Sequence, residues 1–460
     1  MDAGADLDKS NSGGVSIYAR KSWIVRATYD YKGKYLVEAL FRRDGSLKWA
    51  PEGRWGNFPG LLLGWRASEE DFWKNTLPFI NFFKLRASYG QMGMDPGSSF
   101  QYLNKFNLNT GLTFGTGKVI ETTVIPANVA NPAITWETQT TQNVGFDSKF
   151  LNDLFTLNAD FFYNKREHIL AHRDASVPNF TGLSLPDENI ARVDNRGFEV
   201  ELGFNKTINS DFRFSITGNY SYNHNKVIFT DEPERAVPWQ VRTGNSYGVS
   251  ILYDAIGIFA DTNAVNAYPH WANAKPGDVI LRDVNDDKKI DANDRILVDY
   301  TDGPRTFYGA TFDATWKFLS LSVLIQGQGK YLRWNFYDER RGEAGNYYQW
   351  NFDNRWTPTN TVTDVARAFN RYDYYWNSGV QNSTYWLDNT AYCRLKSVVL
   401  TFNIPTKLYK SLGISNASVY VSGNNIALLY TATKHFDPEI GSAGIYPALK
   451  TIAFGANITF

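Results

Sequence analysis

The stretch from Asp283 to Asp294 (D-V-N-D-D-K-K-I-D-A-N-D) has residue types and a spacing that could bind a calcium ion. Calcium prefers carboxylate, amide and carbonyl oxygens, which a calcium-binding loop supplies at alternate positions as the chain curls around the ion. The predicted metal ligands are the side chains of Asp283, Asn285, Asp287, Asp291 and Asp294 and the backbone carbonyl of Lys289.

Two residues depart from the usual pattern of such a loop. Lys288 stands where a Gly normally allows the sharp turn, and Asp294 stands where a longer Glu usually binds the ion through both oxygens. The alternative is an acidic turn in which side chains accept hydrogen bonds from the nearby backbone. The sequence leaves both interpretations open, so Ca²⁺ is a possible cofactor and no other is predicted.

A second candidate for binding chemistry is the aromatic-rich stretch 336–388. Aromatic rings stack on the apolar faces of sugars and on peptide side chains, so such a stretch could form a ligand surface. The predicted substrate-binding residues are Trp350, Tyr374, Tyr375 and Trp376. The alternative is that most of these rings pack within loops or lie at a membrane interface.

Nothing in the sequence indicates catalysis. His168 and His172 are four residues apart, but the surrounding pattern predicts the end of a strand, where this spacing does not bring side chains together. The single cysteine, Cys393, excludes a disulfide framework and a cysteine-based zinc site. The 47 basic and 47 acidic residues cancel, which argues against a general nucleic-acid binder. We expect no enzyme.

The elements that would carry these stretches are β-strands with one apolar and one polar face. In Phe155–Tyr163 and Phe198–Phe204, for example, large apolar residues alternate with polar ones. Aromatic residues make up 16% of the chain, and no run of eighteen apolar residues occurs. These features are typical of strands that cross a membrane, where alternate residues face lipid and aromatic rings mark both interfaces.

The stretch Leu449–Phe460 (LKTIAFGANITF) is predicted to be such a strand and a signal for barrel assembly. Ile452, Phe454, Ala456, Ile458 and Phe460 fall on one face of it. We take Phe454, Ile458 and Phe460 as the residues of the assembly signal.

Short and long connections alternate along the chain. Those after about 150, 205, 318 and 405 are short, whereas 92–133, 167–193, 230–304 and 336–388 are long. Strands that zigzag through a membrane give this pattern, with periplasmic turns at one end and large external loops at the other. The predicted fold is all-β: a transmembrane antiparallel β-barrel segment of about thirteen strands with long extracellular loops.

Several stretches along the chain resemble the C-terminal portion of the SusC/RagA family of TonB-dependent outer-membrane transporters. They include YLVEALFRRDGS, NPAITWETQTTQNVGFD, NIARVDNRGFEVELG, RDVNDDKKIDANDR, YCRLKSVVLTFNIP and YPALKTIAFGANITF. The resemblance implies the later part of a 22-stranded barrel, a plug domain, a SusD-like lipoprotein partner and energy from TonB-ExbB-ExbD. It also implies uptake of oligosaccharides or peptides across the cell outer membrane.

The sequence 1–460 contains no stretch that resembles the plug domain, and its start is not typical of a signal peptide. We therefore expect a fragment of a longer transporter. Two alternatives remain: a soluble or surface-exposed all-β carbohydrate-binding protein, and a passive porin.

Overall fold

The computed structural model describes most of the chain, and its main feature is one large antiparallel sheet. The described residues are 18–114, 119–173, 175, 185–299, 303–335, 348–370, 372–409, 411, 413–433, 436–440, 446 and 448–460. The sheet has thirteen strands, which confirms the predicted all-β fold and strand number. Its strands are β1 (Arg20–Tyr31), β2 (Tyr35–Ser46), β3 (Trp55–Trp65), β4 (Ile80–Met94), β7 (Glu137–Phe150), β8 (Phe155–Ala171), β9 (Glu188–Thr207), β10 (Phe212–Phe229), β15 (Thr306–Trp316), β16 (Leu319–Gln328), β19 (Tyr392–Asn403), β20 (Asn416–Thr431) and β21 (Thr451–Thr459).

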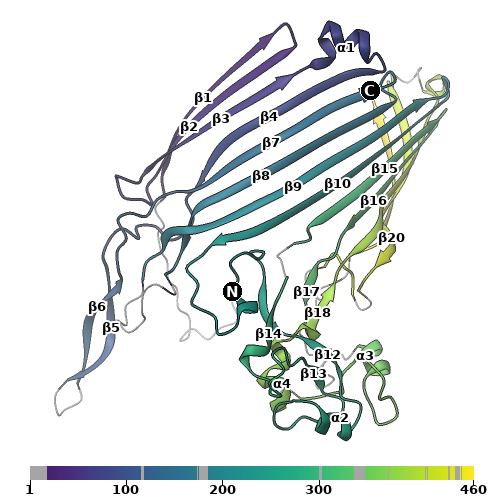
Figure 1. The fold of residues 1–460 in the computed structure, drawn as a ribbon. Coiled ribbons are helices and arrows are strands. Elements are labelled where there is room, and N and C mark those ends of the chain that lie inside the picture. The colour runs from purple at the N-terminus through teal and green to yellow at the C-terminus, as the bar shows by residue number, and fades with distance from the viewer. Residues whose placement is uncertain are drawn as a thin grey trace, which may run out of the picture.

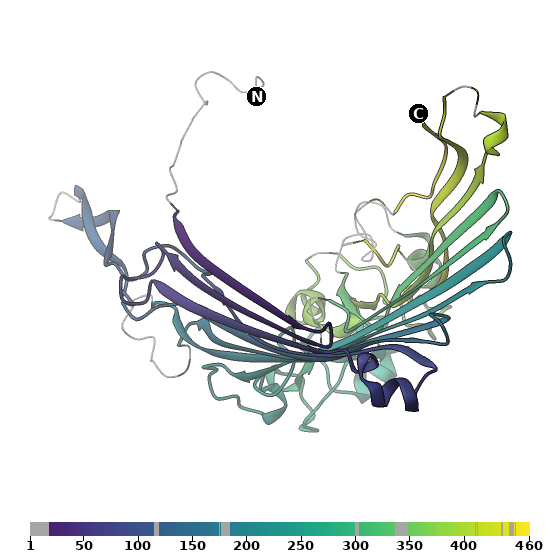
Figure 2. The ribbon, with the colours of Figure 1, turned by 90° about the horizontal axis from the view of Figure 1, so that it is seen from above.

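Each strand of this sheet pairs with the strand of the same sheet that follows it in the sequence, so the topology is a simple meander. Among the described residues, β1 pairs only with β2 and β21 only with β20, which leaves the sheet open. Figure 2 shows the result as a curved trough with the first and last strands at opposite rims. No helix in the described part of the chain is long and apolar enough to cross a membrane.

Three of the connections predicted to be short and the four predicted to be long lie at opposite ends of the sheet. Residues 151–154, 208–211 and 317–318 form tight turns at one end, which we call the short-turn end. The connections 95–136, 172–187, 230–305 and 329–391 lie at the opposite, long-loop end. In Figure 1, helix α1 (Asp71–Thr76) marks the short-turn end, and the helices of the long connections lie at the other.

The long connections contain secondary structure of their own. Four small two-stranded sheets and three short helices occur there. They are β5 (Lys105–Phe114) with β6 (Val119–Asn128), β11 (Ser250–Tyr253) with β14 (Arg295–Val298), β12 (Ala255–Ile258) with β13 (Val279–Leu281), β17 (Leu332–Trp334) with β18 (Leu387–Asn389), and helices α2 (Thr262–Ala267), α3 (Gln349–Asn354) and α4 (Tyr374–Ser378). The β5–β6 hairpin projects from the sheet at the long-loop end and falls where the sequence predicted only a loop (Figure 1).

Cross-strand pairing joins the apolar positions of all thirteen strands into one continuous face, which we call the apolar face. One row of directly opposed residues crosses β1 to β10: Tyr29, Val37, Leu63, Ala87, Val144, Phe161, Phe198 and Tyr222. Another crosses β8 to β21: Phe155, Phe204, Ile216, Phe312, Val323, Val398, Gly423 and Ile452. Many of these side chains are exposed, whereas soluble proteins rarely expose large contiguous apolar surface.

Aromatic rings gather at two levels of the apolar face. Towards the short-turn end, Phe155 contacts Phe204 and Phe204 contacts Phe214, with ring centroids 4.9 and 5.6 Å apart. Towards the long-loop end, Phe198 lies 6.2 Å from Phe161 and 6.0 Å from Tyr222. Rings on the apolar face with aliphatic residues between them are typical of strands that cross a membrane.

Candidate functional site: the polar face and the long-loop end

The opposite side of the sheet, which we call the polar face, carries charged side chains that meet across strands. Arg86 of β4 lies between two carboxylates, with Nη2 2.9 Å from Asp147 of β7 and 2.9 Å from Asp160 of β8. Asp160 lies over Gly145, where an added Cβ would come within 2.4 Å of Oδ1. The absence of a side chain at Gly145 therefore allows Asp160 to reach Arg86.

A groove of 420 Å³ opens beside this ion-pair cluster. Asn158 donates a hydrogen bond to Glu201 at 3.2 Å on its wall, and Glu199 lies exposed next to it. The groove wall thus carries four carboxylates and one guanidinium, so its electrostatic potential is negative. Such a wall favours cationic or hydroxyl-rich solutes over anions.

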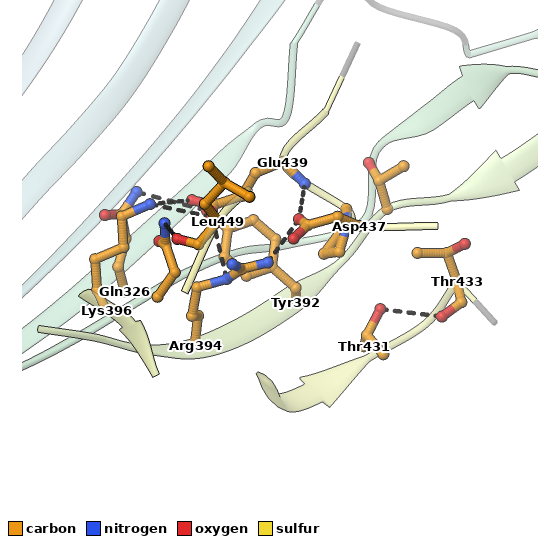
Figure 3. Close-up of polar contacts among 12 residues, drawn as sticks. Gln326, Tyr392, Arg394, Lys396, Thr431, Thr433, Asp437, Glu439 and Leu449 are labelled. Carbon is orange, nitrogen blue, oxygen red and sulfur yellow. Dashed lines mark hydrogen bonds and ion pairs between the residues drawn. The ribbon is translucent and has the colours of Figure 1, made fainter. Parts of the chain in front are cut away.

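A second charged cluster on the polar face fastens the connection between β20 and β21 to the sheet. Residues 436–440, which we call the strap, lie against β19 (Figure 3). Arg394, whose side chain is 3% exposed, contacts Asp437 at 2.6 Å and Glu439 at 3.1 Å. Tyr392 and Lys396 donate to Glu439 at 2.8 and 2.9 Å.

A β-bulge in β19 decides which way Arg394 points. Val398, two residues beyond the bulge, pairs with Val323 of the apolar face, and strict alternation would put Arg394 on the same side. The pairing shifts at Lys396, between Leu395 and Ser397, and this extra residue turns Arg394 to the polar face.

The described parts of the long connections 230–305 and 329–391 pack together around a shared apolar core, which we call the loop core. Buried members include Phe259, Val279, Trp376 and Trp386, and the rings of Phe369 and Trp376 stack with centroids 3.6 Å apart. Several parts of the two connections thus form one packed unit beyond the long-loop end of the sheet.

A buried ion pair connects the two halves of the loop core. Asp278 is fully buried and accepts hydrogen bonds from Arg367 Nε at 2.6 Å and Trp376 Nε1 at 2.9 Å. Arg367 also contacts Asp373 at 2.7 Å. Burial raises the pKa of the Asp278 carboxyl, and the attraction to Arg367 offsets this only in part.

The predicted substrate-binding residues separate into two groups. Tyr375 and Trp376 are each 1% exposed inside the loop core, and the Tyr375 hydroxyl donates to the carbonyl of Val279 at 2.7 Å. This corrects their predicted role, because side chains sealed in a core cannot contact a ligand. Tyr374 is 58% exposed and Trp350 is half-buried, so for these two the predicted role stays a prediction.

The predicted calcium loop forms an ordered turn whose acidic side chains bind the backbone. Asp283 accepts from the amides of Asp287 and Lys288 at 3.3 and 2.8 Å. Asp294 is fully buried, and it accepts from the amides of Val284 and Asp291, both at 2.8 Å.

The other members of the predicted ligand set complete this turn. Asn285 donates to Asp287 at 3.0 Å, and the Lys289 amide donates to Asp287 at 2.9 Å. Lys288 adopts a φ of 67°, the left-handed conformation that Gly usually supplies in calcium loops. Within the described ranges, no group of three or more His, Cys, Asp or Glu residues is arranged to hold a metal ion. The turn is therefore present, and calcium binding stays a prediction.

The predicted assembly strand forms β21, at the edge of the sheet. Phe454, Ile458 and Phe460 are 82%, 55% and 86% exposed, and Phe454 lies opposite Val421 on the apolar face. Its position and alternation are as predicted, and its role in assembly stays a prediction.

Sequence reasoning missed the ion pairs of both clusters and of the loop core. Arg86 and Asp160 are separated by 74 residues, and Arg394 and Asp437 by 43, so spacing along the chain does not reveal them. A usable signal was present, since charged residues such as Arg86 and Asp160 interrupt strands that are otherwise suited to a membrane.

Comparison with known proteins gives a consistent result. Residues 9–277 match the family described as TonB dependent receptor-like, beta-barrel. The TonB-dependent receptor P39 of Formosa agariphila is 28% identical over 97% of this chain and 47% of its own length. The TonB-dependent receptor SusC of Bacteroides thetaiotaomicron is 25% identical over 95% of this chain and 43% of its own length.

Solved structures agree on the fold. A chain of the RagAB peptide transporter is 20% identical and superposes on all of this chain and 50% of its own with a TM-score of 0.74. This chain thus spans about half the length of the relatives that it matches. These relatives are named as receptors and transporters and not as enzymes. The family match covers more than half of the sequence and agrees with the sheet, its two faces and its alternating connections, so the chain belongs to the TonB-dependent receptor-like β-barrel family.

Proposed function

We propose that this chain forms the wall and external loops of an outer-membrane TonB-dependent importer of the SusC/RagA type. The observation that carries the proposal is the continuous apolar face of thirteen strands with a charged polar face behind it. In this placement the apolar face contacts lipid, the polar face lines the lumen, and the aromatic rings lie at the two interfaces. A soluble carbohydrate-binding protein would have to cover the same apolar surface.

The open sheet also supports membership of a larger barrel. Thirteen antiparallel strands give β1 and β21 the same direction, so closing them into an even-stranded antiparallel barrel takes an odd number of further strands. We propose that residues 1–460 supply the later part of a 22-stranded barrel, with the plug and earlier strands elsewhere in the complete transporter. TonB-ExbB-ExbD would then act through that other part.

For the substrate, we propose oligosaccharides or peptides delivered with a SusD-like lipoprotein. The negative groove on the polar face is suited to hydroxyl-rich or cationic solutes. The loop core supplies a preformed surface at the long-loop end on which a lipoprotein could dock. The name of the RagAB peptide transporter supports peptides as one of these two substrate classes.

Cysteine labelling on whole cells tests the membrane placement. A cysteine at Asn209, in a tight turn, and one at Asn360, in a long connection, would each be introduced with Cys393→Ser into the complete transporter. An impermeant maleimide should label position 360 on intact cells and both positions after permeabilisation. Equal labelling on intact cells would refute the placement.

Uptake measurements test the transport activity and separate it from a porin. A strain that lacks the transporter should regain uptake of its oligosaccharide or peptide when the complete gene is restored, and should not regain it in a background without TonB. Uptake that persists without TonB would favour the passive porin.

A further inference from the structure

Basic side chains follow the aromatic rings on the apolar face of β8, β9 and β10, towards the long-loop end. Three successive rows of opposed residues cross these strands. The first consists of Phe161, Phe198 and Tyr222, the second of Tyr163, Arg196 and His224, and the third of Lys165, Asp194 and Lys226. The face thus changes within two rows from rings to cations.

The carboxylates in this region are already engaged. Asp194 accepts a hydrogen bond from the Tyr163 hydroxyl and lies 3.5 Å from Arg192. Glu167 pairs with Lys165 at 2.7 Å and lies 3.9 Å from Arg192. Asp194 also lies opposite Lys226, but the ion pairs of these two acidic groups among the described residues are with Lys165 and Arg192. Two carboxylates thus face more than two cations, so this region keeps a net positive charge.

Arg196 and Lys226 are the uncompensated cations. Both are exposed, and neither side chain has a hydrogen bond or ion pair within the part of the chain that the structure describes. His224 lies opposite Arg196, and its buried Nδ1 has no hydrogen-bond partner in the same part of the chain. Arg196 and Lys226 are close enough to His224 to act electrostatically on its imidazole.

The position of these cations along the strands matches the edge of an apolar layer. Lys165 lies ten residues beyond Phe155, a member of the ring cluster towards the short-turn end. At about 3.3 Å per residue and a tilt of about 40°, ten residues rise about 25 Å, the usual height of the apolar band on a membrane barrel. The cations thus lie at the level of lipid headgroups.

We propose that Arg196 and Lys226 bind the phosphate of an anionic lipid whose acyl chains lie along Phe161 and Phe198. This inference rests on the membrane placement given under Proposed function. Arg196 and Lys226 are diagonal neighbours on adjacent strands, about 7–8 Å apart at their backbones, a separation that one phosphate can bridge with two long side chains. The adjoining rings favour a lipid over a free anion, because only the lipid has an apolar part to cover them.

Native mass spectrometry of the intact transporter in a non-ionic detergent tests this site. The probes are dioleoyl phosphatidic acid and dioleoylglycerol, which share acyl chains and differ in the phosphate. Arg196→Gln combined with Lys226→Gln should weaken phosphatidic acid binding about thirtyfold, given the usual contribution of each basic residue near an anionic lipid surface. The control is Lys84→Gln combined with Arg213→Gln, which removes two cations from the polar face of β4 and β10 and should leave binding unchanged.

Three results would overturn the assignment. These are equal weakening in the two variant pairs, equal binding of dioleoylglycerol, and displacement of the lipid by millimolar inorganic phosphate, which would indicate a site for free anions. If the lipid site alone is wrong, the cysteine labelling of positions 209 and 360 should still be as expected. Failure of the proposed membrane placement would change that labelling first.

Discussion

Replacement of Asp278 by Ala should open the loop core while leaving the sheet intact. Asp278 is fully buried and joins the connection 230–305 to the connection 329–391 through Arg367 and Trp376. The substitution removes the acceptor of both hydrogen bonds. Arg367, whose side chain is 16% exposed, would keep Asp373 as its one acidic partner among the described residues.

The expected magnitude follows from the burial of this pair. Removing one partner of a buried ion pair costs about 3–5 kcal/mol, because the other charge stays desolvated. Arg367 keeps Asp373 at 2.7 Å, which places the expected cost at the lower end of this range. The equilibrium constant for opening the loop core should therefore rise by about two to four orders of magnitude. As a control, Arg282→Ala breaks the Arg282–Asp254 pair of the same connection at 2.7 Å, where the Arg side chain is 54% exposed. That exposed pair should contribute less than about 1 kcal/mol.

Hydrogen exchange of the intact transporter measures this opening locally. The amides of Phe259, Gly277 and Arg367 bond to other backbone carbonyls of the loop core and exchange only when it opens. Their exchange should accelerate strongly in Asp278→Ala and by less than about tenfold in Arg282→Ala. Adding Arg367→Met to Asp278→Ala should recover part of the protection, because the desolvated guanidinium that Asp278 compensated is then gone. Equal exchange in the two single variants would refute the importance of the buried pair.

Three further predictions concern the strap, Glu70 in the connection between β3 and β4, and the predicted calcium loop. Arg394→Met should release residues 436–440 and make them the first site of limited proteolysis, and cleavage there at the wild-type rate would contradict the ion-pair role. The pKa of Glu70 is lowered to about 2 by hydrogen bonds from a tyrosine and a lysine. The stabilising contribution of the Glu70 carboxylate should be present above pH 4.5 and lost as the pH falls towards 2. An acid-induced change in tryptophan fluorescence that reports this loss near α1 should therefore disappear in Glu70→Gln. If the turn at 283–294 binds calcium, a chelator should lower the protease resistance of 276–300. Asp283→Ala combined with Asp287→Ala should abolish this effect of the chelator. Unchanged protease resistance of the native protein with chelator would leave only the structural role of the turn.

The large sheet could be predicted from the sequence because its signals are local. The alternation in Phe155–Tyr163 and Phe198–Phe204 places apolar groups on one face wherever the strands pair, provided that the register is kept. The alternation of short and long connections then fixes which strand ends lie together. By contrast, the β5–β6 hairpin was missed, because Gly-, Asn- and Thr-rich sequence does not distinguish a projecting hairpin from an irregular loop.

The sequence by itself thus determined the fold class, the strands and the two faces of the sheet, since period-two alternation is a property of neighbouring residues. Only the tertiary structure decided which charged groups meet. Arg86 finds Asp160 because three strands lie side by side, and Arg394 points to the polar face only because a single bulge shifts its register. Tertiary structure likewise buried Tyr375 and Trp376, since their exposure depends on Asp278 and other residues almost a hundred positions away. Contacts between residues so far apart in sequence depend on the path of the whole chain, which no local pattern records.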